Sequence, residues 1–337
     1  MTTERSRATG RPTLEEVALR AGVGRGTVSR VVNGSAQVSP RAKQAVEDAI
    51  AELNYVPNRA ARTLVTQRTD SVALVIFESG ERFFAEPFFG RIVQSISSVL
   101  VARNLQMVLM IAQAPEERQR LEGYLTRQHV DGALLLSLHG DDPLPALLEE
   151  RGVATVRAGR PTYAERGTFV DADNRAGARE AVAYLRAQGR RCIAAITGPL
   201  DMAAGIARLD GYRDVVGDGP VAFGDFSEES GAAAMHRLLE QYPQVDAVFA
   251  ASDSMAAGAL RVLRHYGRRV PQDVALIGFD DSVIAQHTDP ALTSVDQPIA
   301  EMGREMVRLL LAKLDGDDDG GDTELVLPTR LVIRGSA

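Results

Sequence analysis

Acidic, hydroxyl and aromatic side chains directly follow short apolar runs in the second half of the chain. Asp280 and Asp281 follow VALIGF, Ser252 and Asp253 follow DAVFA, and Phe226 follows VAF. Carboxylates accept hydrogen bonds from neighbouring hydroxyls, guanidinium groups donate to them, and aromatic faces cover C–H surfaces, so this mixture suits a polyol ring. The candidate ligand-binding residues, which include an arginine after CIAAIT and a glutamine before Pro298, are Phe88, Phe89, Arg208, Phe226, Ser252, Asp280 and Gln297.

Each of these residues also has an ordinary structural interpretation. Asp253 and Asp281 follow strands at positions where a helix N-cap is expected. Phe88 is also compatible with a core position, and Arg208 with a surface ion pair. The pair Asp280-Asp281 is not accompanied by a nucleophile and base, so we expect a binding site and not an enzyme.

The elements that must position these residues form a regular alternation. Apolar runs such as SVALVIF, GALLLS and CIAAIT alternate with amphipathic stretches such as 88–103, 173–188 and 253–267. Fully apolar strands between helices predict parallel sheets covered on both faces. Two such series predict an α/β body of two doubly wound subdomains, with the ligand beyond the carboxyl ends of the strands.

A different chemistry is predicted for residues 13–54. Thr13 and Glu16 fit a capping box, Gly22 a helix C-terminus, and Ser39-Pro40 the start of a third helix that Asn54 ends. Between them, residues 25–33 form a short helix whose valines face inward. Its outward side chains are suited to reading base edges in a DNA major groove. A phosphate-binding loop is disfavoured because a helix, and not a strand, precedes the glycines.

Residues 55–65, YVPNRAARTLV, predict a short hinge helix. Asn58 caps it, and a helix of this length is marginal alone. Leu64 is an apolar wedge beside Arg59 and Arg62, which suits insertion into a base step from the minor groove. An ordinary linker is the alternative.

Charge is divided between the two ends of the chain. The net charge is −7, but residues 1–69 contain 11 Lys and Arg against 6 Asp and Glu. A basic end on an acidic body is typical of a DNA-binding protein with a separate sensing part. The polar first twelve residues and the absence of long apolar segments predict a cytoplasmic protein without membrane contact. Cys192 has no partner, and the histidines lack metal-ligand spacing, so no metal or cofactor is expected.

The motifs T-L-x-x-V-A-x-x-A-G-V, T-V-S-R-V-V-N-G and Y-x-P-N-x-x-A-R-x-L closely resemble the lactose-repressor (LacI/GalR) family of bacterial transcription factors. The resemblance implies phosphate contacts by Thr13, Ser39 and Asn58, base reading by Arg25, Gly26 and Arg30, and an intercalating Leu64. Gly24 and Gly26 depart from the family, because neither supplies a side chain for capping or base reading. The predicted DNA-binding residues are Thr13, Arg25, Gly26, Thr27, Ser29, Arg30, Asn33, Gln37, Ser39, Asn58, Arg62 and Leu64.

The resemblance extends over almost the whole chain and places the seven candidate ligand-binding residues in the family's effector cleft. Met202, Ala203 and Ala204 lack the polar groups of purine-binding relatives, which favours a sugar or sugar derivative. The body is then periplasmic-binding-protein-like. The predicted domains are 12–56 for DNA binding, 57–69 for the hinge, and 70–337 for the body, divided into 70–167 with 298–322 and 168–297 with 323–337.

The predicted function is therefore a repressor whose affinity for a palindromic DNA operator is switched by a small molecule. No heptad tail follows residue 315, so a homodimer matching paired half-sites is expected. Control by a protein partner or by a non-sugar metabolite remains open. A solute-binding protein of the same body fold is a remote alternative, because residues 13–64 have no place in it.

Overall fold

The computed structural model describes residues 12–337 except 33–36, 57–67, 128, 162–166 and 318–320. The chain divides into two compact units, Met1–Thr69 and Asp70–Ala337. The predicted hinge helix, with Asn58, Arg62 and Leu64, lies outside the described residues. Among the described residues, no helix is long and apolar enough to cross a membrane.

The N-terminal unit contains three helices, α1 (Leu14–Ala21), α2 (Arg25–Val32) and α3 (Pro40–Leu53). The capping box forms as predicted: Thr13 Oγ1 accepts from the Glu16 amide at 3.3 Å, and the Thr13 amide donates to Glu16 Oε2 at 2.8 Å. Gly22 and Asn54 end their helices in the left-handed conformation. The core of this unit comprises Val17, Ala18, Val28, Val46, Ala49 and Tyr55.

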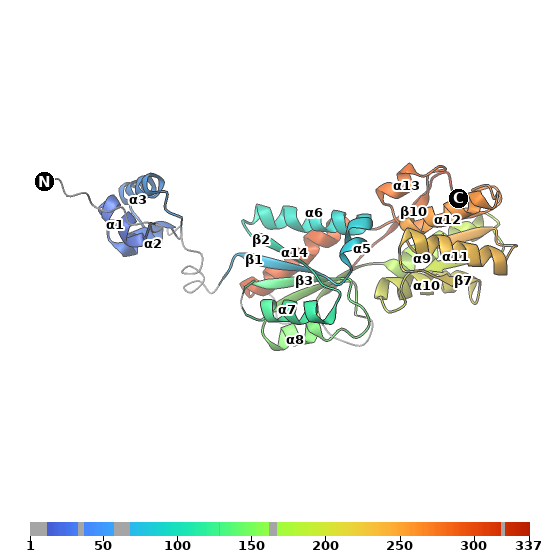
Figure 1. Cartoon of the computed structure of the whole chain (residues 1–337), viewed down its shortest axis with the longest axis horizontal. Helices are drawn as coiled ribbons and strands as arrows, with labels where there is room; N and C mark the ends of the chain where they lie inside the picture. Colours follow the sequence, from blue (N-terminus) through green and yellow to red (C-terminus); the bar gives the residue numbers. More distant parts are fainter. Residues whose placement is uncertain (1–11, 33–36, 57–67, 128, 162–166, 318–320) are drawn as a thin grey trace. The chain divides into compact units, whose positions relative to one another are not determined.

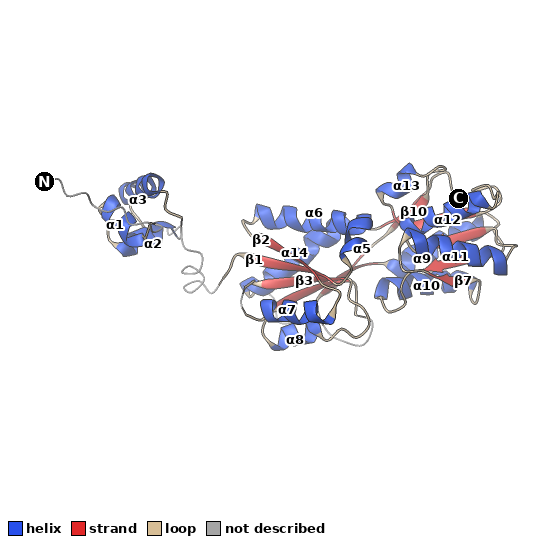
Figure 2. Ribbon diagram, viewed as in Figure 1, coloured by secondary structure: helices blue, strands red, loops and turns tan. Residues whose placement is uncertain are grey.

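The larger unit contains two six-stranded sheets, which define a first and a second subdomain (Figures 1 and 2). Both sheets are parallel except for the antiparallel pair β10–β12. The strand orders are β11-β5-β4-β3-β1-β2 and β12-β10-β9-β8-β6-β7, the doubly wound arrangement that the alternating pattern predicts.

In the first subdomain, successive residues of the central strand β1 face opposite layers. Leu74 packs with α6 and α14, whereas Val75 packs with α7 and α8. Figure 1 shows these helix pairs on the two faces of the sheet. The elements are β1 (Ser71–Ile76), α5 (Gly80–Ala85), α6 (Pro87–Ala102), β2 (Gln106–Ile111), α7 (Pro115–Leu125), β3 (Gly132–Leu136), α8 (Leu144–Glu150), β4 (Ala154–Ala158), β5 (Phe169–Ala172), α14 (Ile299–Asp315) and β11 (Glu324–Leu327).

The second subdomain repeats this design. Ile196 of β6 packs with α11 and α12, and its neighbour Ala195 packs with α9 and α10. The elements are α9 (Asn174–Ala187), β6 (Ile193–Thr197), α10 (Ala203–Val216), β7 (Val221–Phe223), α11 (Glu228–Gln241), β8 (Ala247–Ala250), α12 (Asp253–His265), β9 (Ala275–Asp280), α13 (Val283–His287), β10 (Thr293–Asp296) and β12 (Arg330–Val332).

The division between the subdomains differs from the prediction at two places. Strand β5, predicted to start the second subdomain, pairs with β4 and β11 in the first sheet, so the chain crosses only after Ala172. The C-terminal segment 323–337, predicted to belong to the second subdomain, is divided between the two sheets. Pro328, which has no amide N–H for a sheet ladder, follows β11 of the first sheet, and β12 then joins the second.

Candidate functional site

The body contains a cavity that both subdomains line, at the carboxyl ends of their strands. Its volume is about 1060 Å³ including open solvent at its mouth. The wall from the first subdomain follows β3 and β4 and includes the start of α6. The wall from the second subdomain follows β6 and β9. Six of the predicted residues lie in this wall: Phe88, Phe89, Arg208, Phe226, Asp280 and Gln297.

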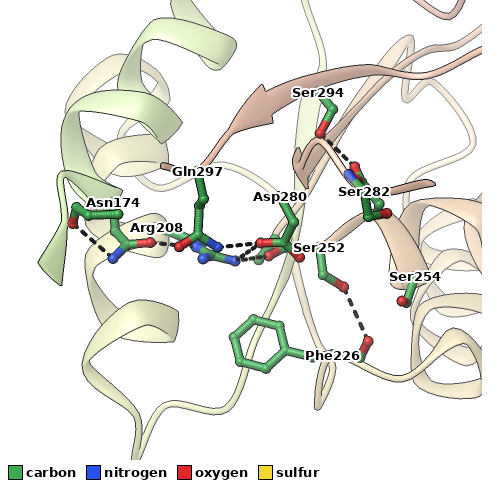
Figure 3. A network of polar contacts seen from close by, with 12 residues as sticks. Asn174, Arg208, Phe226, Ser252, Ser254, Asp280, Ser282, Ser294 and Gln297 are labelled. Carbon is green, nitrogen blue, oxygen red and sulfur yellow. Dashed lines mark hydrogen bonds and ion pairs between the residues drawn. The ribbon is translucent and has the colours of Figure 1, made fainter. Parts of the chain in front are cut away.

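Arg208 is the central cation of the cavity wall. Its side chain is 5 % exposed, and its Nε donates to Asn174 Oδ1 at 2.9 Å while Nη1 donates to the carbonyl of Ala251 at 2.5 Å. The guanidinium carbon lies 3.7 Å from the ring centroid of Phe279, a cation–π geometry. The alternative of a surface ion pair is therefore wrong, because the guanidinium is buried and held from several sides (Figure 3).

Asp280, the last residue of β9, faces Arg208. Its Oδ1 lies 3.4 Å from Arg208 Nη1 and accepts from Gln297 Nε2 at 2.5 Å (Figure 3). Burial raises the pKa of Asp280, and the charge of Arg208 is the main opposing influence. The backbone of Asp280 has a φ of 105°, rare for a residue with a side chain, and Arg91 Nη1 donates to its carbonyl at 3.0 Å. Strain of this kind is typical of binding sites.

Phe226 supplies the aromatic face. Its ring lies 5.5 Å from the Arg208 guanidinium carbon and 5.6 Å from that of Arg82. The ring sits directly over Gly198, where an added Cβ would come within 2.3 Å of two ring atoms. Phe89 is buried in the core, and Phe88 is half-buried and packs against the same core while also lining the cavity. The core interpretation and the cavity interpretation of Phe88 are thus compatible.

Ser252 does not lie in the cavity wall. It is the N-cap of α12, where its hydroxyl accepts from the Met255 amide at 3.1 Å and donates to the carbonyl of Phe226 at 3.2 Å. The hydroxyl of Ser252 thus already donates one hydrogen bond and accepts another within the protein, whereas the other six predicted residues line the cavity. Ser252 instead holds the backbone that carries the Phe226 ring (Figure 3).

The prediction that Asp253 and Asp281 are helix N-caps is wrong. The N-cap positions of α12 and α13 are occupied by Ser252 and Ser282. The Asp253 carboxylate is buried and accepts from the Ser282 amide at 2.7 Å and from Ser294 Oγ at 2.6 Å. Burial, followed by the charge of Asp280, raises the pKa of Asp253 to about 7. Asp281 pairs with Arg334 at 2.6 Å. Both carboxylates therefore hold the loop that presents Asp280.

Residues not predicted from the sequence extend the polar wall into the first subdomain. Arg160 Nε donates to Asp171 Oδ2 at 2.9 Å, and Asn174 Nδ2 donates to Asp171 Oδ1 at 3.0 Å. Because Asn174 also accepts from Arg208, one hydrogen-bonded chain runs from Arg160 to Asp280 across both subdomains. Arg160 and Asp171 lie at the ends of strands β4 and β5, the same signal that identified Asp280.

In the N-terminal unit, α2 exposes the side chains that were predicted to read DNA. Val28 is fully buried, whereas Arg25 and Arg30 are exposed and Thr27 and Ser29 are half-buried. Arg25 Nε lies 3.1 Å from Glu15 Oε1, an exposed ion pair of small net stability. The outer face of α2 is thus basic, and Arg25 has only a weak internal competitor for an external anion.

The remaining predicted DNA-binding residues lie at helix ends or outside the described residues. Thr13 and Ser39 cap α1 and α3, and helix N-termini attract anions such as phosphate. Gly26 and Gln37 are exposed. Helix α2 begins at Arg25, directly after Gly24, which has no side chain to cap it. Asn33, like the three hinge residues, is outside the described part of the chain.

Comparisons with known proteins agree with both units. Residues 13–58 match the model for bacterial regulatory proteins of the lacI family, and residues 182–337 match the periplasmic binding protein-like domain. The HTH-type transcriptional regulator CelR of Thermobifida fusca is 54 % identical over 335 residues, covering 97 % of this chain and 98 % of that protein. The HTH-type transcriptional repressor CytR of Escherichia coli is 33 % identical and covers 96 % of both chains.

Solved structures give the same result over the whole chain. A transcriptional regulator CelR–cellobiose complex has a TM-score of 0.77 and 52 % identity, covering 97 % of this chain and all of that one. A lac repressor dimer bound to operator and the anti-inducer ONPF has a TM-score of 0.85 and 28 % identity, covering 97 % and 99 %.

The chain therefore belongs to the lacI family of bacterial regulatory proteins, as the motifs predict. It is a DNA-binding transcriptional regulator that joins a helix-turn-helix domain to a periplasmic-binding-protein-like body. The match over residues 13–58 removes the solute-binding alternative. The relatives are regulators and not enzymes.

Proposed function

We propose that this protein is a homodimeric repressor that releases a palindromic operator when a disaccharide, cellobiose or a close β-linked relative, enters the cavity. The observation that carries the proposal is the buried group of Arg208, Asp280 and Gln297 beside the Phe226 ring. The cellobiose complex of a regulator 52 % identical over 97 % of this chain supports the same ligand class.

The chemistry of the wall favours a saccharide over a nucleobase. Asp280 offers acceptors for ring hydroxyls, Arg208 offers donors, and the half-buried Phe226 ring offers a face for C–H groups. Met202 and Ala203, on the same wall, carry no group able to pair with the edge of a purine. The chain of hydrogen bonds from Arg160 to Asp280 brings polar groups of both subdomains to the same wall.

For DNA binding, we assign base reading to the outer face of α2, with Arg25 and Arg30 as the donors suited to guanine. Thr13, Gln37 and Ser39 are assigned to phosphate contacts, together with Thr27 and Ser29. Asn33 completes the helix-turn-helix set, and Gly26 allows close approach of the backbone. Asn58, Arg62 and Leu64 of the hinge are assigned to the minor groove, with Leu64 as the wedge.

The effector acts through the two subdomains. Since both subdomains line the cavity, a bound disaccharide contacts both and changes the preferred angle between them. An effector shifts the population of DNA-binding conformations only by its differential affinity for the two arrangements. Release of DNA follows if the disaccharide favours an angle other than the operator-binding one, because it then removes dimers from the operator-binding arrangement.

The test is a fluorescence anisotropy titration with a labelled palindromic fragment from the region upstream of the gene. Cellobiose, glucose, ribose, a sugar phosphate and a purine nucleoside are added in parallel at constant salt. Release by cellobiose and not by the nucleoside is expected. If DNA binds and no saccharide alters the affinity, the saccharide assignment is wrong, and a protein partner or a different metabolite controls the repressor.

A further inference from the structure

Glu86 occupies an unusual position in the cavity wall. It is the residue before α6, the N-cap position, yet its side chain makes no hydrogen bond to the start of that helix. Its Oε2 instead accepts from Ser254 Oγ at 3.0 Å. Ser254 belongs to α12 of the second subdomain, so this hydrogen bond joins the two subdomains at the wall of the cavity.

The charged groups around Glu86 come from both subdomains. Asp280 of β9 and Asp225 before α11 oppose its ionisation, whereas Arg82 of α5 favours it. Arg82 is itself paired with Glu78 at 3.1 Å. Burial, followed by the charge of Asp280, raises the pKa of Glu86 to about 7, against the hydrogen bond from Ser254.

The second carboxyl oxygen of Glu86, Oε1, has no hydrogen-bond partner among the described residues and is not fully enclosed by the protein. Glu86 lines the cavity, so the hydroxyl of a ligand bound there could donate to Oε1.

We propose that Glu86 is a second effector-binding carboxylate, which accepts a hydroxyl of the saccharide through Oε1 while Oε2 holds Ser254 of the other subdomain. The inference rests on the proposed function and deepens it: the ligand is a hydroxyl-donating sugar, because Glu86 and Asp280 both offer acceptor oxygens to it. Glu86 thereby also links the bound ligand to the contact between the subdomains.

This role has a defined proton linkage. A hydroxyl that donates to Oε1 stabilises the ionised carboxylate, so the pKa of Glu86 falls from about 7 when the sugar binds. Below pH 7, sugar binding must first remove the proton, and it releases up to about one proton. The contribution of Glu86 to sugar affinity is therefore fully present above pH 7 and is lost as the pH falls below 7.

The experiment is isothermal titration of the full-length protein with cellobiose at pH 6, 7 and 8, each in two buffers of different ionisation enthalpy. The variants are Glu86→Gln, Ser254→Ala, and the matched control Glu81→Gln, whose exposed carboxyl on the adjacent helix α5 does not line the cavity. Glu86→Gln should bind about tenfold more weakly than wild type at pH 8 and about twofold more weakly at pH 6. It should also lose the proton release.

Ser254→Ala separates binding from structure. It removes the hydrogen bond between the subdomains but keeps the carboxyl group, so it should retain the pH dependence that Glu86→Gln loses. If Ser254→Ala reproduces every effect of Glu86→Gln, Glu86 only holds the subdomains together and the proposal is overturned. It is also overturned if Glu86→Gln binds like wild type at all three pH values. A wild-type protein that binds no saccharide would overturn the proposed function itself.

Discussion

The guanidinium of Arg208 and the carboxylate of Asp280 lie 3.4 Å apart, with side chains only 5 % and 13 % exposed, at the end of a strand that carries strained backbone. Neither charge is stable there alone, because burial disfavours the charged form of each. Arg208 comes from α10 and Asp280 from β9, so the pair forms only when the second subdomain is folded.

Removing the arginine should therefore destabilise the body. Arg208→Ala leaves Asp280 buried without its cation, and about 3–5 kcal/mol of unfolding free energy should be lost. Urea unfolding of the body measures this loss. Arg261→Ala, which removes an exposed ion pair with Glu228, serves as the control and should cost under about 1 kcal/mol. Equal stability of the two variants would contradict the buried pair.

Replacing the carboxylate should separate sensing from DNA binding. Asp280→Asn keeps the shape of the side chain and removes the negative charge facing Arg208. Operator affinity without ligand should remain within about twofold of wild type, while cellobiose affinity falls by about tenfold or more, the scale of a charge-assisted hydrogen bond. An Asp280→Asn protein that still releases the operator at the wild-type cellobiose concentration would remove Asp280 from the site.

The contact between Gly198 and the Phe226 ring can be changed without removing any polar group of the site. In Gly198→Ala, the new Cβ lies 2.3 Å from the ring atoms Cε1 and Cζ, so the ring must move. Effector affinity should fall by about tenfold, the scale of one aromatic contact. Gly123→Ala on α7, where a Cβ meets no atom within 4 Å, should leave cellobiose binding unchanged in the same titration.

The ion pair between Glu15 and Arg25 predicts a gain in DNA affinity. Glu15→Gln frees Arg25 and removes a negative charge from the DNA-binding unit. Affinity for operator and for unrelated DNA should each rise about two- to fivefold at low salt, and the gain should shrink as salt is raised. The same change at Glu240 on α11 of the body should have no effect on DNA affinity. A decrease for Glu15→Gln would show that Glu15 itself supports the complex.

The sequence predicts the helices of the N-terminal unit and the alternation of the body well, because caps and apolar periodicity are local signals. Thr13, Gly22 and Asn54 end or begin helices where expected. Strands β5 and β11 belong to the first sheet, although their residues were predicted to lie in the second subdomain. Pairing between strands distant in sequence depends on the whole fold, so local patterns do not predict it.

The candidate site was predicted in part for the same reason. The position after a strand predicts Asp280, but the predictions do not include Arg160 and Asp171 of the first subdomain, although these residues also lie at strand ends. Ser252 has the right position in sequence, yet its hydroxyl is used to cap α12. The direction of a side chain depends on the local backbone, which a strand-end rule does not describe.

The most direct test of the central claim is a thermodynamic cycle for the wild-type protein at fixed salt. The operator Kd is measured without cellobiose and at saturating cellobiose, and the cellobiose Kd is measured for free and operator-bound protein. We predict that cellobiose weakens operator binding by a factor of about 5 to 150, and that operator weakens cellobiose binding by the same factor. An operator Kd that is unchanged by saturating cellobiose would contradict the account.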